Sequence, residues 1–439
     1  MKVKRSNKLT RRSFLASAAA AVAIPNIIPG SALGLSGSVP PSERIGIGVI
    51  GLGIRGKLHV HSLLPLPQCQ IVAVSDLFKS RREYAKDSVE RHYANSTSSG
   101  KYNGCDTYND FRELLSRSDI DAVVVATPEF WHGLHGVAAV KAGKDVYGEK
   151  ALTLTVAQGR TLVDSVRRYG RIFQVGTQQR SYMSFRFACE LVRNGYLGKL
   201  HTVKVGVPGG HALPDAPASP VPDGFDYETW LGPAPWKPYD AIRCTSPDGW
   251  YHIYDYCAGW IQSWGVHHVD IALWGAPSLH SSTLEVEGTA VFPEKGLGNT
   301  SLTWNVNFTT PDGLRLSFTD NAVHEQGCRF EGEQGWVHVN RKGISAGPKS
   351  LLNVKIKPFE ERLYESNHHH INFLECVRNR QDPVAPVEAG HAATTATLIA
   401  DIATRVGRKL TWDWKKEKFL NDPVANRMLK RSMRSPWII

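Results

Sequence analysis

The sequence lacks the features that mark several classes of protein. Its seven cysteines include no Cys-x-x-Cys pair and no zinc-ligand spacing, so we expect neither a disulfide scaffold nor a metal site. No apolar run reaches the roughly 20 residues that cross a bilayer, so we expect no stable membrane anchor. After a short N-terminal leader is set aside, about 400 residues remain, which is enough for two domains.

A basic body is also missing, although the whole chain has a formal net charge of +11. Residues 1–12 hold six basic and no acidic side chains, and residues 415–434 hold seven basic and two acidic ones. The body between them is therefore close to neutral. Because nucleic-acid binding needs a basic face on the folded body, we expect no nucleic-acid partner. Residues 413–439 are predicted to form a basic tail, exposed or in contact with another subunit.

The first 33 residues have the order of an export leader. The Arg11-Arg12 pair precedes a short apolar run over 14–24, which Pro25 ends. A charged segment followed by a short apolar segment is typical of a signal peptide, and adjacent arginines are typical of the twin-arginine route. We predict a twin-arginine signal peptide over 1–33, a linker or arm over 34–43, and a periplasmic or otherwise exported location.

A dinucleotide-binding fingerprint follows the leader. An apolar strand over 45–50 runs into Gly51, Gly53 and Gly56, and a helix is expected over 55–64. The first glycine permits a tight turn, the second lets the backbone approach a pyrophosphate, and the third lets the helix pack on the strand. The predicted cofactor contacts in this loop are Gly51, Gly53, Ile54, Arg55 and Gly56.

The choice between NAD and NADP depends on the residues after the second strand. Asp76 ends that strand, 25 residues after Gly51, where a carboxylate can accept both ribose hydroxyls and repels a 2′-phosphate. Lys79, Arg81 and Arg82 follow closely and would bind that phosphate if their loop turned inward. We predict NAD as the cofactor, contacted by Asp76, and keep NADP as the alternative.

Strands and helices continue to alternate as far as residue 178, which predicts a doubly wound Rossmann domain over 44–178. An apolar strand over 120–127 runs into Thr127-Pro128, and a strand over 145–148 runs into Glu149-Lys150. Loops at such strand ends line the cofactor crevice. The further predicted cofactor contacts are Thr127, Pro128, His132, Glu149 and Lys150.

A second domain, of the α+β type, is predicted over 179–412, so the fold class of the whole chain is α/β. Polar–apolar alternation between Gly, Pro and Asp turns predicts an open, mostly antiparallel sheet. We expect this sheet to offer a face for a homo-oligomer. Its expected strands cover 199–207, 281–292, 300–308, 314–319, 328–339 and 352–357.

Five motifs together resemble the glucose–fructose oxidoreductase, inositol dehydrogenase and MocA family. They are the glycine fingerprint, an ATP-x-x-x-H run over 126–132, Glu149-Lys150, Gln-Val-Gly-Thr over 174–177 and Gly-Val-His-His-Val-Asp over 265–270. The resemblance implies an oxidoreductase in which Lys150 hydrogen-bonds the hydroxyl that becomes a carbonyl and His267 takes its proton. A cation near that oxygen stabilises developing negative charge, and a histidine is suited to accept the proton near neutral pH.

The segment around the histidine has helical periodicity. His267 and Asp270 are three residues apart and therefore share a face, whereas His268 is expected on the helix surface. Two positions depart from the pattern of many family members. Ala151 stands in place of a proline, and Ser263 stands in place of an aspartate.

A long insertion over 208–260 is rich in Pro, Trp, Tyr and Asp. Loops of this length are usually functional, and aromatic rings can stack on the apolar face of a sugar while polar side chains bind its hydroxyls. The same aromatics can also simply pack the loop against the body. The candidate substrate contacts are Arg180, His211, Arg243, Tyr251, Asp255, Ser263 and His267.

Three adjacent histidines, His368-His369-His370, open a helix predicted over 367–378. Consecutive residues on a helix point about 100° apart, so we do not expect these three to share a metal ion.

Together these observations predict an exported NAD(P)-dependent oxidoreductase that acts on a hydroxyl of a sugar or cyclic polyol. Free dinucleotide should be scarce outside the cytoplasm, so the cofactor would be held tightly and recycled in place. Two alternatives stay open. One is a redox-neutral, NAD-dependent glycoside hydrolase that oxidises the sugar transiently and then returns the hydride. The other is a non-catalytic sugar-binding protein with a vestigial cofactor site.

Overall fold

The computed structural model describes residues 43–95, 101–245 and 249–439. The predicted signal peptide over 1–33 and almost all of the predicted linker over 34–43 lie outside the described residues, so both stay predictions. Residues 45–439 fold together as one unit.

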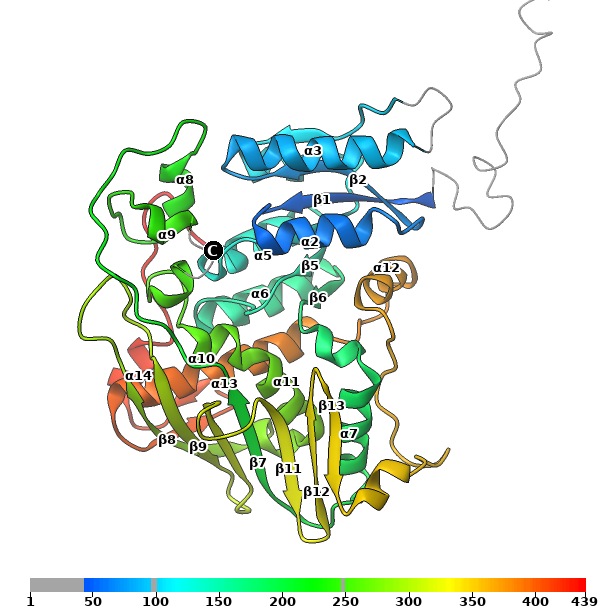
Figure 1. Ribbon diagram of the computed structural model, residues 1–439, viewed down its shortest axis with the longest axis vertical. Helices are drawn as coiled ribbons and strands as arrows, with labels where there is room; N and C mark the ends of the chain where they lie inside the picture. The colour runs from blue at the N-terminus through cyan, green and yellow to red at the C-terminus, as the bar shows by residue number, and fades with distance from the viewer. Residues whose placement is uncertain (1–42, 96–100, 246–248) are drawn as a thin grey trace, which may run out of the picture. The chain divides into compact units, whose positions relative to one another are not determined.

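The first sheet of this unit is parallel throughout and has the strand order β3-β2-β1-β4-β5-β6. Its strands are β1 (Ile45–Ile50), β2 (Cys69–Ser75), β3 (Asp106–Tyr108), β4 (Ala122–Val125), β5 (Asp145–Gly148) and β6 (Phe173–Val175). The two central strands, β1 and β4, are buried along their whole length, which is typical of a parallel sheet covered on both faces. The predicted Rossmann fold is confirmed (Figure 1).

Helices cover both faces of the Rossmann sheet. Side chains of α2 (Ile54–Leu63), α3 (Lys79–Ala94) and α12 (His369–Asn379) share a core with Ile47 and Val49. On the opposite face, α4 (Phe111–Leu115), α5 (Glu129–Lys141) and α6 (Val156–Tyr169) share a core with Ile50. Neighbouring strand residues thus point to opposite faces. The helix that follows the three histidines, α12, belongs to the Rossmann core although it lies late in the sequence.

The second sheet has nine strands in the order β13-β12-β11-β7-β10-β9-β8-β14-β15. Its strands are β7 (Leu200–Val207), β8 (Thr283–Val291), β9 (Thr303–Thr309), β10 (Arg315–Asp320), β11 (Gly327–Gly332), β12 (Gly335–Asn340), β13 (Gly343–Gly347), β14 (Leu410–Asp413) and β15 (Lys418–Phe419). Neighbours run antiparallel except β7 and β10, which are parallel. The predicted open, mostly antiparallel sheet is confirmed.

Two of the expected strands were wrong. The segment 328–339 is not one strand but a hairpin of β11 and β12, because Glu333 and Gln334 form a turn between two glycines. The segment 352–357 pairs with no strand, and the 3₁₀ helix η7 (Lys349–Asn353) overlaps its start. The edge strand is instead β13.

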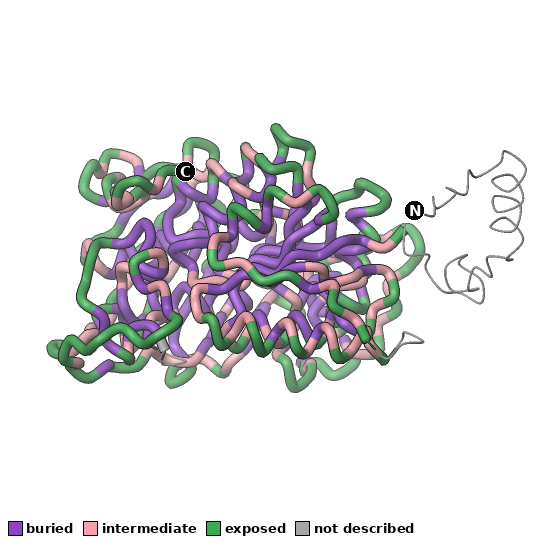
Figure 2. Tube along the Cα trace, turned by 90° about the horizontal axis from the view of Figure 1, so that it is seen from above, coloured by how far each residue is buried: buried purple, intermediate pink, exposed green. Residues whose placement is uncertain are grey.

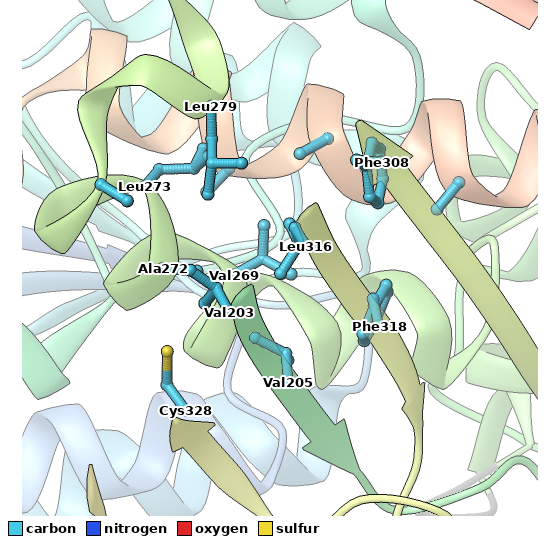
Figure 3. Packing of buried hydrophobic residues seen from close by; sticks show 14 of the residues in the cluster. Val203, Val205, Val269, Ala272, Leu273, Leu279, Phe308, Leu316, Phe318 and Cys328 are labelled. Atoms are coloured by element: carbon cyan, nitrogen blue, oxygen red, sulfur yellow. The ribbon is translucent and has the colours of Figure 1, made fainter. Parts of the chain in front are cut away.

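Three helices cover one face of the second sheet: α7 (Met183–Arg193), α11 (Gly265–Gly275) and α13 (Val387–Val406). Figure 3 shows Val269 and Ala272 of α11 facing Val203 of β7 and Leu316 of β10 across this core. The helix α13 also packs against α6 of the Rossmann region. The two sheets are therefore joined by a shared helical layer.

Short elements connect these layers. They are η4 (Gln178–Ser181), α8 (Tyr227–Leu231), α9 (Ala241–Thr245), η5 (Trp250–His252), α10 (Trp260–Ser263), η6 (Pro277–His280) and α14 (Pro423–Arg427). Within the predicted insertion, Phe225, Trp230 and Tyr256 pack on the Rossmann core beside α5. The insertion is thus seated on the first domain, although the second domain supplies it.

The predicted separate tail over 413–439 was wrong in part. Lys418–Phe419 forms the edge strand β15, and Arg434 donates a hydrogen bond to the carbonyl oxygen of Gly232 at 3.0 Å. The ring of Trp437 meets that of Trp131 edge-on at 4.7 Å between centroids. Apolar side chains in this segment attach it to the rest of the fold. A count of charges does not register them, so it suggests a free tail.

Buried segments run through the middle of the folded unit and exposed segments surround them, as Figure 2 shows. Among the described helices, none combines the length and apolar character needed to cross a bilayer.

Candidate active site

A cavity of about 460 Å³ opens at the carboxyl ends of four strands of the Rossmann sheet. Residues that follow β1, β2, β4 and β5 line it on one side, and the insertion together with α10 and α11 lines it on the other. Ligands of doubly wound sheets bind at this edge, where the strand order reverses. Twelve of the predicted site residues line it: Gly51, Gly53, Ile54, Arg55, Asp76, Thr127, Pro128, Glu149, Lys150, Tyr251, Ser263 and His267.

The glycine loop forms one end of the cavity. Gly51 has a φ of +89°, and a Cβ atom there would lie 2.6 Å from the carbonyl oxygen of Ala126. A Cβ atom on Gly56 would lie 1.9 Å from the carbonyl oxygen of Gly51, so this glycine allows α2 to pack on β1. At Gly53 the nearest atom, on Arg81, is 4.0 Å away. The loop is thus closed by protein at two glycines and open at Gly53, above the N-terminus of α2, which fits an anionic pyrophosphate.

Asp76 lies beside this loop. Its carboxylate accepts hydrogen bonds from the backbone N–H groups of Leu52 at 2.6 Å and Phe78 at 2.9 Å. Arg81 lines the cavity with its Nη1 atom 3.9 Å from the same carboxylate, whereas Arg82 is hydrogen-bonded to the Asp76 carbonyl oxygen and to Asn109. A carboxylate held in this way fits the ribose hydroxyls of a dinucleotide.

Glu149 is held by a buried hydrogen-bond network. Its Oε1 atom accepts from Arg55 Nε and from His59 Nε2, both at 2.8 Å. His59 is in turn hydrogen-bonded to His370 at 2.8 Å. Burial by itself raises the pKa of Glu149, but the His59 hydrogen bond and the Arg55 charge outweigh it and hold that pKa well below its usual value. Glu149 is therefore a fixed negative charge at the junction of the two ends of the cavity.

Lys150 marks the other end of the cavity. Its ammonium group donates hydrogen bonds to the hydroxyl of Ser263 at 2.8 Å and to its carbonyl oxygen at 3.0 Å. The ring centroid of Tyr251 lies 5.7 Å from the Lys150 Nζ atom. The Lys150–Ala151 peptide bond is cis. The hydrogen bonds hold the ammonium group against α10, near the ring of Tyr251 in the insertion.

His267 lies in the first turn of α11 and also lines the cavity. Burial, reinforced by the positive charges of Lys150 and Arg341, lowers the pKa of His267 well below its usual value. Its imidazole is therefore neutral at physiological pH, the form that can accept a proton. Its Nδ1 atom has no hydrogen-bond partner among the described residues.

His268 does not lie on the helix surface, as was expected. It is buried, with its Nδ1 atom 3.2 Å from Gln179 Nε2 and its ring stacked near Phe185. The expectation was wrong because α11 is buried on all sides, between the second sheet and its neighbouring helices. A helix with no exposed face gives no amphipathic signal by which its two histidines could be distinguished.

Two of the predicted cofactor residues act behind the cavity wall. Gly56 lies in the helix–strand contact described above. The two ring nitrogens of His132 lie 2.7 Å from the carbonyl oxygen of Ala151 and 2.6 Å from that of Thr127. Burial lowers the pKa of His132, so the neutral ring donates its single N–H to one of these two oxygens. It therefore clamps together two loops that line the cavity.

Four of the predicted substrate residues are not brought to the cavity. Arg180 forms a buried ion pair with Asp270 at 2.7 Å, and Arg243 forms one with Asp240 at 2.9 Å. The ring of His211 packs on Trp260, 4.5 Å between centroids, and Asp255 is half-buried outside the lining. The two arginines are paired within the fold, which sequence spacing does not reveal.

The sequence interpretation missed several lining residues. Five tryptophans complete the aromatic wall beside Tyr251: Trp131, Trp230, Trp250, Trp260 and Trp264. Arg341, from the turn between β12 and β13, also lines the cavity, with its guanidinium 4.9 Å from the centroid of Trp264. The insertion's aromatic richness was a usable signal for the wall as a whole. No local pattern marks Arg341, because only the second sheet brings its hairpin there.

Comparison with known proteins matches both regions. Residues 45–177 match the family model described as "Oxidoreductase family, NAD-binding Rossmann fold". Residues 191–439 match the one described as "Oxidoreductase family, C-terminal alpha/beta domain".

Individual relatives are more distant. The chain is 29% identical over 159 residues to a myo-inositol 2-dehydrogenase of Thermotoga maritima, covering 36% of this chain and 44% of that protein. It is 29% identical over 161 residues to a glycosyl hydrolase family 109 protein of a Shewanella species, covering 37% and 34%. The match thus spans less than half of each relative.

Among solved structures, the fold resembles that of the WlbA dehydrogenase from Bordetella pertussis in complex with NADH and UDP-GlcNAcA. The TM-score is 0.61 and the sequence identity 17%, covering 83% of this chain and 98% of that one. At this identity the likeness concerns the fold alone. The family-model match over residues 191–439 by itself spans more than half of the chain, and the protein therefore belongs to the Gfo/Idh/MocA family of oxidoreductases, with an NAD-binding Rossmann domain.

Proposed function

We propose that the protein is an exported NAD-dependent oxidoreductase that acts on a hydroxyl group of a sugar or cyclic polyol. One observation carries this proposal. A single cavity has a loop that fits a dinucleotide at one end and Lys150, Ser263 and His267 at the other, beside an aromatic wall. Both halves of the reaction thus have their groups in one enclosed space.

The proposed roles follow from the chemistry of these groups. NAD, when bound, accepts a hydride from the substrate carbon. Lys150 stabilises the negative charge that develops on the hydroxyl oxygen. His267, neutral in the folded protein, accepts the hydroxyl proton. Ser263 holds the ammonium group of Lys150 in place.

NAD is preferred over NADP because of Asp76, whose carboxylate would repel a 2′-phosphate. Arg81 is the nearby cation that lines the cavity and would favour NADP. We expect Asp76→Ala to raise NADP affinity relative to NAD by about tenfold, since one like-charge repulsion is removed. Binding titrations with both nucleotides measure this ratio, and an unchanged ratio would remove Asp76 from the proposed role.

The substrate class rests on the aromatic wall. Tryptophan and tyrosine rings pack against the apolar faces of sugar and polyol rings, and their polar edges stay available for hydroxyl groups. The names of the relatives, an inositol dehydrogenase and a glycosyl hydrolase, agree with a cyclic polyhydroxylated substrate.

Export remains part of the proposal because of the Arg11-Arg12 leader. Outside the cytoplasm a released dinucleotide would be lost, so we propose that the cofactor is loaded before export, held tightly and recycled in place. Mass spectrometry of nucleotide released from protein recovered from the periplasm tests this directly. Stoichiometric NAD is expected, and periplasmic protein without nucleotide would contradict it.

A redox-neutral glycoside hydrolase is the second candidate, favoured by the glycosyl hydrolase relatives. The two activities separate in one assay with the protein's own nucleotide. Addition of a free sugar or polyol should produce the absorbance band of reduced nicotinamide if the protein is a dehydrogenase. Release of a chromogenic aglycone without added NAD would instead establish the glycosidase.

A further inference from the structure

Three arginine side chains line the cavity: Arg55, Arg81 and Arg341. Two of them have acidic partners. The Nε atom of Arg55 lies 2.8 Å from Glu149, and the Nη1 atom of Arg81 lies 3.9 Å from Asp76. Arg341 forms an ion pair with no carboxylate in the described part of the chain; its contacts there are with an amide and an aromatic ring. The proposed function gives this third guanidinium no role.

Contacts with two neighbours hold the Arg341 side chain in place. Its Nε atom donates a hydrogen bond to Gln179 Oε1 at 3.2 Å, and its guanidinium carbon lies 4.9 Å from the ring centroid of Trp264. Gln179 is fully buried and donates through Nε2 to the carbonyl oxygen of His267 at 3.0 Å. The ring of Trp264 meets that of His267 edge-on at 5.8 Å between centroids. The guanidinium is therefore positioned beside the first turn of α11, next to the proposed base.

The contact through Nε leaves the two terminal nitrogens of Arg341 available to a ligand. Neither Nη1 nor Nη2 has a hydrogen-bond partner among the residues that the structure describes. The residue is exposed to solvent and lines the cavity, so a molecule bound in the cavity can reach these nitrogens. Two N–H groups on one planar guanidinium match the two oxygens of a carboxylate, and such charge-assisted pairs are strong hydrogen bonds.

The charges of the lining favour a single negative charge on the substrate. Beside the two ion-paired arginines, the lining holds two further cations, Lys150 and Arg341. Lys150 is assigned to the reacting oxygen, so Arg341 remains for another group of the same molecule. A dinucleotide pyrophosphate fits over Gly53 at the N-terminus of α2, whereas Arg341 is anchored at α11. A phosphate ester carries close to two negative charges, more than one guanidinium compensates, whereas a carboxylate carries one.

We propose that Arg341 binds a carboxylate of the substrate, so that the protein acts on a sugar acid of the uronate type rather than on a neutral sugar or polyol. This inference rests on the proposed function, because it names the substrate class of the same cavity. Lys150 and His267 act on the hydroxyl group, while Arg341 holds the carboxylate and orients the sugar ring against the aromatic wall. Arg341 is thus a specificity-determining residue.

Ligand binding tests this assignment without reliance on turnover. The thermal unfolding temperature of the protein with its own nucleotide is measured against ligand concentration, since a ligand that binds the folded state raises it. The probes are D-glucuronate and D-galacturonate, the two matching uronamides, which keep the skeleton without the charge, and the corresponding hexose 6-phosphates. We expect at least one uronate to bind about tenfold more tightly than its uronamide, because hydrogen bonds to charged groups contribute more than neutral ones.

Three variants separate the guanidinium from general charge effects. Arg341→Gln should lower the affinity for that uronate about tenfold and leave that for its uronamide nearly unchanged. Arg341→Lys keeps the charge but loses the two-pronged geometry, so its affinity for the uronate should lie between the two. Lys342→Gln removes one positive charge from the adjacent, exposed position of the same turn, outside the lining, and is the matched control. It should leave both affinities unchanged.

Several results would overturn the proposal. One is that neither uronate binds more tightly than its uronamide, and another is that Arg341→Gln weakens both ligands equally. A lower nucleotide content in purified Arg341→Gln, with unchanged uronate affinity, would assign the guanidinium to the cofactor instead. A hexose 6-phosphate that binds more tightly than both uronates would overturn the choice of a carboxylate.

Turnover distinguishes this inference from the proposed function. In Arg341→Gln the KM for the uronate should rise about tenfold while kcat changes less, because a binding contact remote from the reacting carbon is lost. If uronates bind in the manner that depends on Arg341 but none is oxidised, the proposed function fails while the assignment of Arg341 stands. If a neutral polyol is oxidised equally well by Arg341→Gln and no uronate is preferred, the further inference fails alone.

Discussion

The two ends of the cavity differ in how their polar groups are satisfied. At the nucleotide end, Asp76 accepts two backbone hydrogen bonds and Glu149 accepts from Arg55 and His59. At the substrate end, the Nδ1 atom of His267 has no such partner in the described structure. The first end is preorganised by the protein itself. The substrate end leaves a buried titratable group without a hydrogen-bond partner from the protein, as is typical of a site for proton transfer.

The ends also differ in how the chain builds them. Residues 50–81, which run from the end of β1 to the first turn of α3, supply most of the nucleotide end. The substrate end draws on the loop after β5, the insertion, α10, α11 and the turn after β12. A change at the first end should therefore act locally on nucleotide affinity. A change at the substrate end should lower turnover while the bound nucleotide is retained.

The largest effect is expected from a change at Arg180. If this residue bound substrate, it would belong to the substrate end of the cavity. Arg180→Ala leaves the buried carboxylate of Asp270 without its guanidinium partner. We expect the free energy of unfolding to fall by about 3–5 kcal/mol, measured by denaturant titration. Normal stability with lost substrate affinity would instead return Arg180 to the substrate site.

Lys150→Ala tests the division between chemistry and binding. We expect turnover to fall by about 10²–10³-fold, because a group that stabilises developing oxyanion charge is lost, while bound nucleotide is retained. Steady-state rates and nucleotide content of the same preparation measure both. Lys141→Ala, on the exposed end of α5, is the control. Unchanged turnover in Lys150→Ala would remove this residue from the mechanism.

Glu129→Gln is expected to change how the free energy of unfolding depends on pH. The pKa of Glu129 is raised from 4.5 to about 7 in the folded protein. Between these values the native state holds a proton that the unfolded state has released, so the stability contributed by this carboxyl falls as the pH rises. Relative to wild type, the variant should gain up to about 3 kcal/mol between about pH 5 and pH 8. Denaturant unfolding at both pH values checks this, and a difference independent of pH would contradict the shift.

The smallest effect concerns the glycines of the nucleotide end. In Gly53→Ala the added methyl group meets open space in the protein, so stability should change little while nucleotide affinity falls about tenfold through loss of close approach. In Gly56→Ala the methyl group would collide with the Gly51 carbonyl, so the protein itself should be destabilised. Thermal unfolding with and without added NAD separates the two. If both changes had equal effects on stability and on nucleotide affinity, the interpretation of Gly53 as open to the nucleotide would be contradicted.

The same contrast explains what the sequence could predict. Local spacing identified the glycine loop and Asp76, because one β-α-β unit fixes their relation before any long-range packing. Glu149-Lys150 could be placed at the end of a later strand, and the role of Lys150 came from the family resemblance. The motif around His267 could be placed on a helix but not beside Lys150, except by resemblance. Arg180 and Arg243 were misassigned because their partners, Asp270 and Asp240, are found only in the folded structure. Glu129 and Arg341 gave no signal, since burial and a distant hairpin decide their surroundings.

The central claim is that one cavity couples a bound dinucleotide to oxidation of a hydroxyl group beside Lys150. The most direct measurement is the absorbance of reduced nicotinamide after a panel of sugars and cyclic polyols is added to protein that carries its own nucleotide. The account predicts that the band appears with at least one compound in the wild type and is lost in Lys150→Ala at equal nucleotide content. A nucleotide-loaded protein that gives the band equally without Lys150 would contradict it.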